Sequence, residues 1–501
     1  MGSNNLPDCG NLCHESTGSA LSSTLGLGKG SVTIDDFHVT DLLISVGQNP
    51  GTNHPRGLTA FTRCKENGGK IIAINPMPEA GLMNFQEPQD PRTLIGGKHQ
   101  IADDYLQVRL DGDRAFFQAV NKELIKRDAI DHEFIEKFCH GFDELKEHLL
   151  SLDDDELARG HGLRQQDVLN TADAIEEAKT CVISWTLGVT QHRDAVGTIR
   201  EMVNTLLLTG NIGKPGAGTA PLRGHSNVQG NRTVGIWEKM PDEFLQAVED
   251  YFGFSTPREH GFDSVASGQA MRDGKTKFFM SLGGNFVRVM SDTLEAEKGM
   301  ANNELTVHLS TKPNGSHTWP GEKSLILPVK ARTDRDLQAS GPQKVTVEDS
   351  VAKVHASIGH RRANEDLSLA SEVEIICSIG RETFGDAFWQ PLIDDYANTA
   401  TPLRAPSPAS MTTTSASKPP AGSTCPTARA NACSTPIPAK RTSAATTRRC
   451  WTFRRGTSCS PRCAATTSTT PRFMGSTTAT VASRMADASC SSTPTTLPRW
   501  G

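Results

Sequence analysis

The sequence predicts an α/β fold of two lobes, each built on a doubly wound, mostly parallel sheet. Short apolar runs that end in Gly or Pro recur along residues 1–398, as buried parallel strands do. Segments with apolar residues spaced three and four apart separate several of these runs, which is typical of crossover helices. This pattern stops near residue 399, so we predict that an unstructured C-terminal tail follows the two lobes.

The first lobe is predicted to cover residues 1–215. DLLISVG (41–47) and KIIAINP (70–76) are its first two strands, and FTRCKENGGK between them fits a crossover helix with a Gly stop. The remaining predicted elements are helices over 113–128 and 132–152, a strand over 180–185, and a helix over 195–218 that Gly and Pro close.

The second lobe is predicted to cover residues 216–398. Its strand series consists of TKFFMSLGG (276–284), ELTVHLST (304–311) and KSLILP (323–328). With 501 residues, the chain has ample length for two or three domains with cores of their own.

Composition excludes several classes of protein. No stretch approaches the roughly 18 to 20 apolar residues that a membrane span requires, and no signal peptide is visible. The net charge of -5 argues against a nucleic-acid-binding surface. The cysteines before residue 400 are scattered like those of cytosolic proteins, apart from the pair Cys9 and Cys13, so we expect a cytoplasmic protein.

Residues 399–501 differ in composition from the rest of the chain. They are rich in Thr, Ser, Ala, Pro, Arg and Cys, and Asp487 is their one acidic residue. One interpretation is a disordered basic tail. The other, which we favour, is a frameshift near Thr399: read one base out of register, RFMGSTTATVAS permits the strand-and-turn sequence YGLDDRYRGI.

Cys13 and His14 form the first candidate site. A thiolate is a soft ligand for molybdenum, an iron–sulfur cluster or zinc, and the adjacent imidazole can move a proton there. A lone buried thiol, a disulfide with Cys9 and half of a zinc site are the alternatives; the further zinc ligands are not found nearby.

Several loops that follow predicted strands carry Gly, Asn and Pro. SVGQNPGTNHPR (45–56) and Asn75-Pro76 follow the first two strands, where backbone amides can approach a phosphate. TGNIGKPGAGTAPLRGHSNVQG (209–230) contains Arg223, which can hold a carboxylate bidentately. With the loops at 281–292 and 310–319, they indicate a large cofactor with several phosphates, although ordinary turns explain each loop taken alone.

These motifs resemble the molybdopterin-dependent oxidoreductases of the formate dehydrogenase/DMSO reductase superfamily, in particular the YdeP-type formate dehydrogenase-like branch. The resemblance covers residues 4–398 and includes that superfamily's two-lobed α/β fold. It rests on NNLPDCGNLCHES, GQNPGTNHPR, LTGNIGKPGAG, PLRGHSNVQG, GGNFVRVMSDT and VTVEDSVAKVHAS.

The resemblance assigns roles to individual residues. Cys13 matches the residue that ligates molybdenum, His14 the adjacent proton-handling histidine, and Arg223 the arginine that faces the substrate. Asn75 stands where much of the superfamily has Asp, and His225 where it has Gln. The positions that match contacts to two pterin guanine dinucleotides are Gly47, Asn49, Asn53, Asn75, Pro76, Gly112, Asp113, Leu187, Gln191, Gly224, His225, Gly284, Asn285 and Asp292.

The resemblance also implies the cofactors and the activity. The implied cofactors are a molybdenum bis(molybdopterin guanine dinucleotide) centre and a [4Fe-4S] cluster, the latter held by a preceding segment that this chain lacks. A β-barrel domain is expected to follow the second lobe. The implied reaction is two-electron oxidation of a small substrate such as formate, with an electron acceptor protein and with neither nucleic acid nor membrane as partner. A catalytically inactive, truncated and frameshifted remnant is the alternative. An NAD(P)-binding Rossmann protein is a weaker one, because GxGxxG and the ribose-binding acid are missing.

Overall fold

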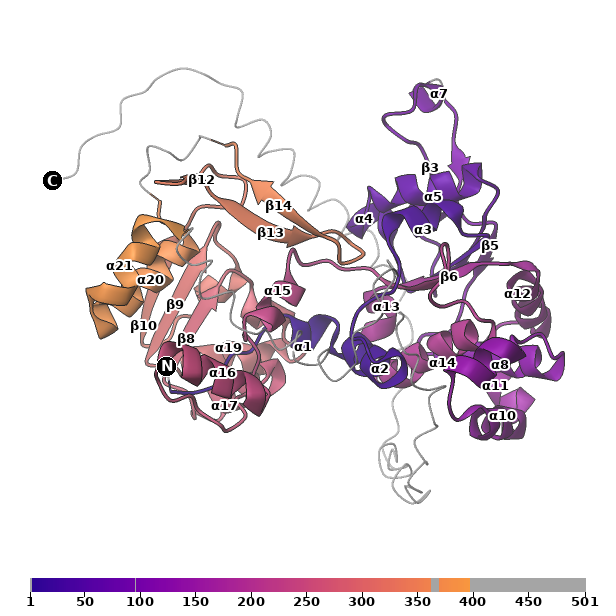
Figure 1. Ribbon diagram of the computed structural model, residues 1–501, viewed down its shortest axis with the longest axis horizontal. Helices are drawn as coiled ribbons and strands as arrows, with labels where there is room; N and C mark the ends of the chain where they lie inside the picture. The colour runs from indigo at the N-terminus through magenta and orange to yellow at the C-terminus, as the bar shows by residue number, and fades with distance from the viewer. Residues whose placement is uncertain (1, 95, 362–368, 397–501) are drawn as a thin grey trace, which may run out of the picture. The chain divides into compact units, whose positions relative to one another are not determined.

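The computed structural model describes residues 2–94, 96–361 and 369–396 (Figure 1). All of them belong to one of the two units into which the chain divides, Met1–Pro436. The predicted C-terminal tail and the predicted frameshift lie outside the described residues.

A five-stranded, fully parallel sheet forms the centre of the N-terminal half. The first strand in the sequence lies in the middle of the sheet. The next two strands lie on one side of it, and the last two lie on the other side. In sheet order the strands are β5 (Asp104–Leu106), β2 (Lys70–Ile74), β1 (Leu42–Val46), β6 (Cys181–Trp185) and β7 (Gly218–Pro221).

Both faces of this sheet are buried. Along β1, Leu42 and Ile44 belong to the apolar core on one face, and Leu43 between them belongs to the core on the other. This alternation is the period of two that a strand imposes on its side chains. Helices therefore cover both faces, which is the doubly wound arrangement the sequence predicts.

The helices of this half divide between the two faces (Figure 1). Phe37 and Phe61, from α3 (Ile34–Val39) and α5 (Gly57–Glu66), stack on one face with ring centroids 6.1 Å apart. The opposite core is built on α2 (Glu15–Leu25), α8 (Asp113–Lys126) and α14 (Ala195–Leu208). The other helices are α1 (Gly10–Cys13), α4 (Pro50–Asn53), α6 (Ala80–Met83), α7 (Pro91–Leu94), α9 (His132–Phe138), α10 (Phe142–Ser151), α11 (Asp154–His161), α12 (Gln165–Glu177) and α13 (Leu187–Thr190).

A second parallel sheet follows, with strands in the order β10 (Lys323–Pro328), β9 (Leu305–Ser310) and β8 (Phe278–Leu282). Phe279 packs with the core of α18 (Phe286–Val289) and α19 (Thr293–Ala301), whereas Met280 packs with a separate cluster that includes Ile375 of α20 (Glu372–Phe384). The helical elements of this half are α15 (Val228–Thr233), α16 (Asp242–Phe252), α17 (Ser264–Arg272), α18 (Phe286–Val289), α19 (Thr293–Ala301), the 3-10 helix η1 (Gly315–Thr318), α20 (Glu372–Phe384) and α21 (Asp386–Asp394).

Three antiparallel strand pairs complete the described structure. They are β3 (Asn84–Phe85) with β4 (His99–Gln100), β11 (Leu337–Gln338) with β12 (Gly341–Pro342), and β13 (Lys344–Glu348) with β14 (Val354–Ile358).

The predicted α/β class with parallel sheets is confirmed. The helix expected over 132–152 is two helices, because the chain turns at Gly141, which has a φ of 77°. The boundary at 215/216 stays a prediction, and β7, which belongs to the first sheet, begins at Gly218. None of the helices in the described ranges has the length and apolarity that a membrane crossing needs.

Candidate active site

The candidate site lies where the strand order of the first sheet reverses, at the carboxyl ends of β1 and β6. In open α/β sheets the loops diverge at this point and leave a crevice for ligands. Gly47 follows β1 with a φ of 60°, and a Cβ on it would lie 2.7 Å from the carbonyl carbon of Gly188. Gly188 N donates to Gly47 O at 3.2 Å, so the two loops touch backbone to backbone and require glycine on both sides.

Cys13 and His14 sit in a turn that is docked on the loop after β6. Cys13 ends α1, and its carbonyl oxygen accepts a hydrogen bond from Thr190 Oγ1 at 2.9 Å. Gln191 Nε2 donates to the carbonyl oxygen of Leu12 at 2.5 Å. These side-chain bonds to main-chain carbonyls fix the turn that presents the thiol and the imidazole.

Polar residues from the second half of the chain, partly buried, support the same turn. Arg232 NH2 lies 3.1 Å from Glu15 Oε2 and 3.4 Å from Asp8 Oδ1. Asn11 Nδ2 donates to the buried carboxylate of Glu238 at 3.4 Å. Arg232 also lies over the ring of Trp237, 5.0 Å from its centroid. Residues on both sides of Cys13 and His14 are therefore held by ion pairs.

A small cavity of about 40 Å³ opens at the docked turn. Its wall contains six of the predicted site residues, which come from segments far apart in the sequence: Cys13, His14, Leu187, Arg223, Gly224 and His225. The structure thus brings the predicted thiol, imidazole and guanidinium together in one pocket.

Arg223 is oriented by a buried carboxylate. Its Nε lies 3.0 Å from Glu348 Oε2, and the Glu348 side chain is fully buried at the end of β13. Glu348 Oε1 accepts the backbone N–H of Gln229 at 2.8 Å, and Arg223 N donates to Ser350 O at 2.9 Å. Because Glu348 faces Nε, the terminal nitrogens of the guanidinium remain for a ligand in the pocket.

Burial controls the protonation of the pocket. It raises the pKa of the Cys13 thiol, and the positive charge of Arg223 opposes that rise. Burial also lowers the pKa of His14 to about 4, and Arg223 and Arg232 act in the same direction. At neutral pH the imidazole is uncharged, so it can accept a proton.

Other predicted site residues are engaged in local structure. Asn49 caps α4 and donates to Glu79 Oε2 at 2.6 Å, and Asn53 ends that helix. The buried Asn75 donates to Gln48 O at 2.6 Å, and Pro76 O accepts from Gln107 Nε2 at 3.3 Å. They shape the loops after β1 and β2, and their contacts with a cofactor stay predictions.

Gly112 and Asp113 lie at the start of α8, outside the cavity wall. Asp113 is buried, and its Oδ2 lies 3.8 Å from His192 Nδ1, which is 3.3 Å from Asp111 Oδ1. Burial raises the pKa of Asp113 to about 6, although His192 opposes the rise.

The predicted residues of the second sheet, Gly284, Asn285 and Asp292, do not line this cavity either. Gly284 O accepts from Asn314 Nδ2 at 2.8 Å, and Asn285 Oδ1 accepts from Ser316 Oγ at 2.9 Å. Asp292 caps α19. A dinucleotide contact at these positions stays a prediction.

Sequence reasoning missed two charged residues of the site. Lys29 lines the cavity from the loop between α2 and α3, and the signal that could have identified it is the glycine-rich stretch GLGKGS at 26–31. Glu348 lies within VTVEDSVAKVHAS, a motif that the resemblance uses, but no local signal shows that its carboxylate meets Arg223.

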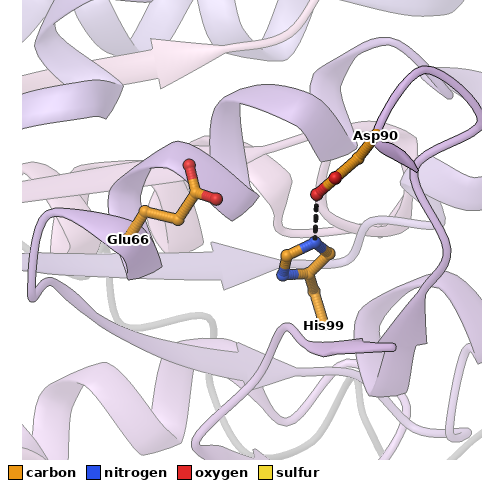
Figure 2. Close-up of side chains that lie close together, drawn as sticks. All are labelled: Glu66, Asp90 and His99. Carbon is orange, nitrogen blue, oxygen red and sulfur yellow. Dashed lines mark ion pairs between the residues drawn. The ribbon is translucent and has the colours of Figure 1, made fainter. Parts of the chain in front are cut away.

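A second group of potential ligand atoms lies outside the cavity. Glu66, Asp90 and His99 each offer one such atom, and these atoms lie within 4.8 Å of one another (Figure 2). His99 Nε2 and Asp90 Oδ2 form an ion pair at 3.4 Å. Glu66 is exposed. The Asp90–His99 pair joins the start of α7 to β4, so local packing of the segment between them accounts for the group.

Comparison with known proteins identifies the relatives of this chain. A model of the molybdopterin oxidoreductase family matches residues 1–318. The protein named "Uncharacterized oxidoreductase Rv2900c" of Mycobacterium tuberculosis is 46% identical over 405 residues, 79% of this chain and 52% of the relative. YdeP of Escherichia coli K12 is 41% identical over 408 residues, 79% of this chain and 54% of that protein. The chain thus spans about half the length of these curated relatives.

Two further similarities are more distant. The F420-dependent formate dehydrogenase subunit alpha of Methanocaldococcus jannaschii is 32% identical over 249 residues, 49% of this chain and 34% of that subunit. The structure of acetylene hydratase from Pelobacter acetylenicus matches with a TM-score of 0.57 at 18% identity, over 78% of this chain and 53% of that one. This last likeness shows the fold alone. The family match over residues 1–318, together with the thiol, imidazole and guanidinium gathered in one pocket, shows that the chain belongs to the molybdopterin oxidoreductase family.

Proposed function

We propose that this chain carries the catalytic residues of a molybdenum-dependent oxidoreductase that removes two electrons from a small anionic substrate such as formate. The observation that carries the proposal is the pocket in which Cys13, His14 and Arg223 meet. A soft metal ligand, a neutral base and a carboxylate-binding fork are the groups that this chemistry requires.

The residues of the pocket fit a molybdenum–pterin cofactor. Cys13 offers a thiolate, which a bound metal would keep deprotonated against the effect of burial. Gly224 lies in the pocket wall with no other atom within 4 Å of the place where a Cβ would be, so the backbone there is open to a ligand. We infer the bis(molybdopterin guanine dinucleotide) form, with Cys13 as the protein ligand of the metal.

Each residue has a defined task in the proposed reaction. Oxidation of formate yields carbon dioxide, a proton and two electrons. The cofactor, when bound, takes up the two electrons. Arg223 holds the carboxylate through its terminal nitrogens, and Glu348 keeps the guanidinium in the required orientation. His14 accepts the proton, and a bound anion beside Arg223 raises the basicity of His14 by offsetting the positive charge.

The remaining assignments rest on the motifs that resemble the family. We propose that residues 1–215 and 216–398 form two lobes that each contribute contacts to the dinucleotides, through Gly47, Asn49, Asn53, Asn75, Pro76, Gly112, Asp113, Leu187, Gln191, Gly224, His225, Gly284, Asn285 and Asp292. We propose that a [4Fe-4S] cluster in the full-length protein and a cytoplasmic acceptor protein carry the electrons onward. The substrate is a small molecule, and neither nucleic acid nor membrane takes part.

Metal analysis and a dye-coupled assay test this proposal on the full chain, produced in cells that make the cofactor. We expect molybdenum and pterin fluorescence in the purified protein, formate-dependent reduction of a viologen dye, and loss of both metal and turnover in Cys13→Ser. Arg223→Lys should lower kcat/KM by roughly 2–4 kcal/mol of transition-state stabilisation, the scale for losing a preorganised donor. Equal turnover in Cys13→Ser and the parent chain overturns the proposal, and a metal-free parent chain favours the inactive remnant.

A further inference from the structure

Lys29 is a cation of the pocket that the proposed reaction does not use. It lines the same cavity as Cys13, His14 and Arg223, on the loop between α2 and α3. Within the described part of the chain, no ion pair or hydrogen bond involves its ammonium group.

The backbone holds Lys29 beside the segment that leads to Arg223. Ser31 N donates to Thr219 O at 3.0 Å, and Thr219 N donates to Ser31 Oγ at 3.0 Å. Gly30 packs so closely on β7 that a Cβ there would lie 2.9 Å from both Pro221 Cδ and Thr219 O. The Lys29 loop therefore runs along β7, and Arg223 follows the end of the same strand.

The charges of the pocket divide into two parts. Arg223 is paired with Glu348, so the two together contribute no net charge. Among the described residues that line the cavity there is no Asp or Glu, and the permanently charged side chains are those of Lys29 and Arg223. Lys29 therefore supplies the uncompensated positive charge that an anion entering the pocket meets.

We propose that Lys29 is a further specificity-determining residue, which selects small anionic substrates by charge while Arg223 orients their carboxylate. This inference rests on the proposed function, which identifies the ligand of the pocket as a substrate. The division of tasks follows from the contacts: Arg223 is fixed by a buried partner and presents a planar fork, whereas Lys29 is a point charge on a flexible stem.

Alkylation of Cys13 tests the role of Lys29 without turnover, on the full chain produced in cells that do not make the cofactor, so that the Cys13 thiol is free to react. Iodoacetate carries a carboxylate and iodoacetamide is neutral, and both form the same S–C bond with loss of iodide. The ratio of their rates at Cys13 reports attraction of the anion, because a change in the reactivity of the thiol affects both reagents. Rates are read at Cys13 by peptide mass spectrometry in a Cys9→Ala background, which removes the neighbouring thiol.

Lys29→Met should lower the iodoacetate-to-iodoacetamide ratio about three- to tenfold, the effect of one charge several ångströms away at an effective dielectric between water and a protein surface. Lys29→Arg should keep the ratio. Lys277→Met is the matched control, because Lys277 is exposed and paired with Glu304 at 3.0 Å, and it should leave the ratio unchanged. Raising the salt concentration should reduce the parent ratio toward that of Lys29→Met.

Competition with added anions separates substrate from cofactor as the ligand of Lys29. Formate should slow iodoacetate labelling of the parent chain, and this protection should weaken in Lys29→Met. An unchanged ratio in Lys29→Met overturns the proposal even if the chain proves to be an active molybdenum enzyme. Protection by inorganic pyrophosphate but not by formate, lost in Lys29→Met, also overturns it and assigns Lys29 to the cofactor phosphates. A chain that binds no molybdenum, yet shows the expected ratio, rejects only the proposed function.

Discussion

Arg223 Nε lies 3.0 Å from Oε2 of Glu348, whose side chain is fully buried. Glu348 Oε1 meanwhile accepts the backbone N–H of Gln229. The carboxylate therefore joins the segment that carries Arg223 to β13, and its orientation decides where the guanidinium points. A buried charge pair of this kind is costly to break from one side, because the remaining charge is left without a partner.

We predict that Glu348→Gln destabilises the chain by about 1–3 kcal/mol, the scale for leaving a buried polar group without its partner. The amide keeps an acceptor for Gln229 N but loses the charge that pairs with Arg223. Denaturant unfolding measures the change in the free energy of unfolding. When Arg223→Gln is added to Glu348→Gln, it should lower this free energy by less than it does in the parent chain.

The matched control for this prediction is Glu304→Gln. Glu304 pairs with Lys277 at the same distance of 3.0 Å, but both side chains are largely exposed. Exposed pairs contribute between zero and about 1 kcal/mol, so this substitution should change stability little. Equal losses in the two variants would show that burial of Glu348 is not what makes its pair with Arg223 matter.

Gly47→Ala should disrupt the contact between the loops after β1 and β6. Gly47 has a φ of 60°, and the added Cβ would approach Gly188 backbone atoms to 2.7 Å. Gly68→Ala is the control, because Gly68 has a φ of 91° but no atom within 4 Å of a Cβ. Both variants bear a left-handed backbone cost of roughly 1–2 kcal/mol. Gly47→Ala should lose measurably more in thermal unfolding; a loss no greater than that of Gly68→Ala would contradict the close approach.

The sequence predicted the strands whose residues are buried on both faces. Leu42–Val46 and Cys181–Trp185 are buried throughout, and such runs are apolar without interruption, so they stand out from their surroundings. β7 was missed because Gly218–Pro221 contains no large apolar residue and lies in a stretch that reads as a glycine-rich loop. Its place in the sheet comes from parallel pairing with β6, which is a tertiary contact.

The same limit applies to the pocket. Cys13, His14 and Arg223 were identified from their chemistry and from motifs that resemble a known family, and the structure places them together. Lys29 and Glu348 were not identified, because the place of Lys29 depends on contacts between its loop and β7, and the role of Glu348 lies in its pair with Arg223. Neither contact has a local pattern in the sequence, since tertiary packing alone brings the partners together.

The buried carboxyl of Asp113 should make stability depend on pH in a defined direction. Burial raises its pKa from 3.8 to about 6, so the folded chain binds a proton that the unfolded chain releases between these values. Its contribution to stability is fully present below about pH 4, is lost as the pH rises to about 6, and stays lost above it. Thermal unfolding of the parent chain and of Asp113→Asn between pH 4 and 7 measures this contribution as the difference between them.

We expect Asp113→Asn to gain stability relative to the parent as the pH rises through this window, by up to about 3 kcal/mol at pH 7 from a shift of roughly two pKa units. Asp111→Asn is the comparison, because Asp111 is half exposed and contacts the same His192 imidazole at 3.3 Å. If the stability of the parent minus that of Asp113→Asn stays constant or rises between pH 4 and 7, then Asp113 is ionised in the folded chain over this range.

The last prediction concerns the basicity of His14. Its pKa is lowered to about 4 by burial first, and then by the positive charges of Arg223 and Arg232, while Asp8 acts in the opposite direction. Arg232→Gln removes one of these charges and leaves the Asp8 carboxylate without its ion pair, so both effects raise the pKa of His14. The value should stay below 6.5, because burial, the largest cause, remains.

Carbethoxylation by diethyl pyrocarbonate measures this change, because only the neutral imidazole reacts, and peptide mass spectrometry reads His14 separately from the other histidines. The midpoint of its pH dependence should move upward in Arg232→Gln. It should not move in Arg258→Gln, which removes an arginine that pairs with Asp242 and Glu249 instead. A midpoint that stays fixed or falls in Arg232→Gln would mean that Arg232 acts on the turn only through packing. An upward shift would instead show that the second half of the chain sets how readily His14 gives up the proton that it is proposed to accept from the substrate.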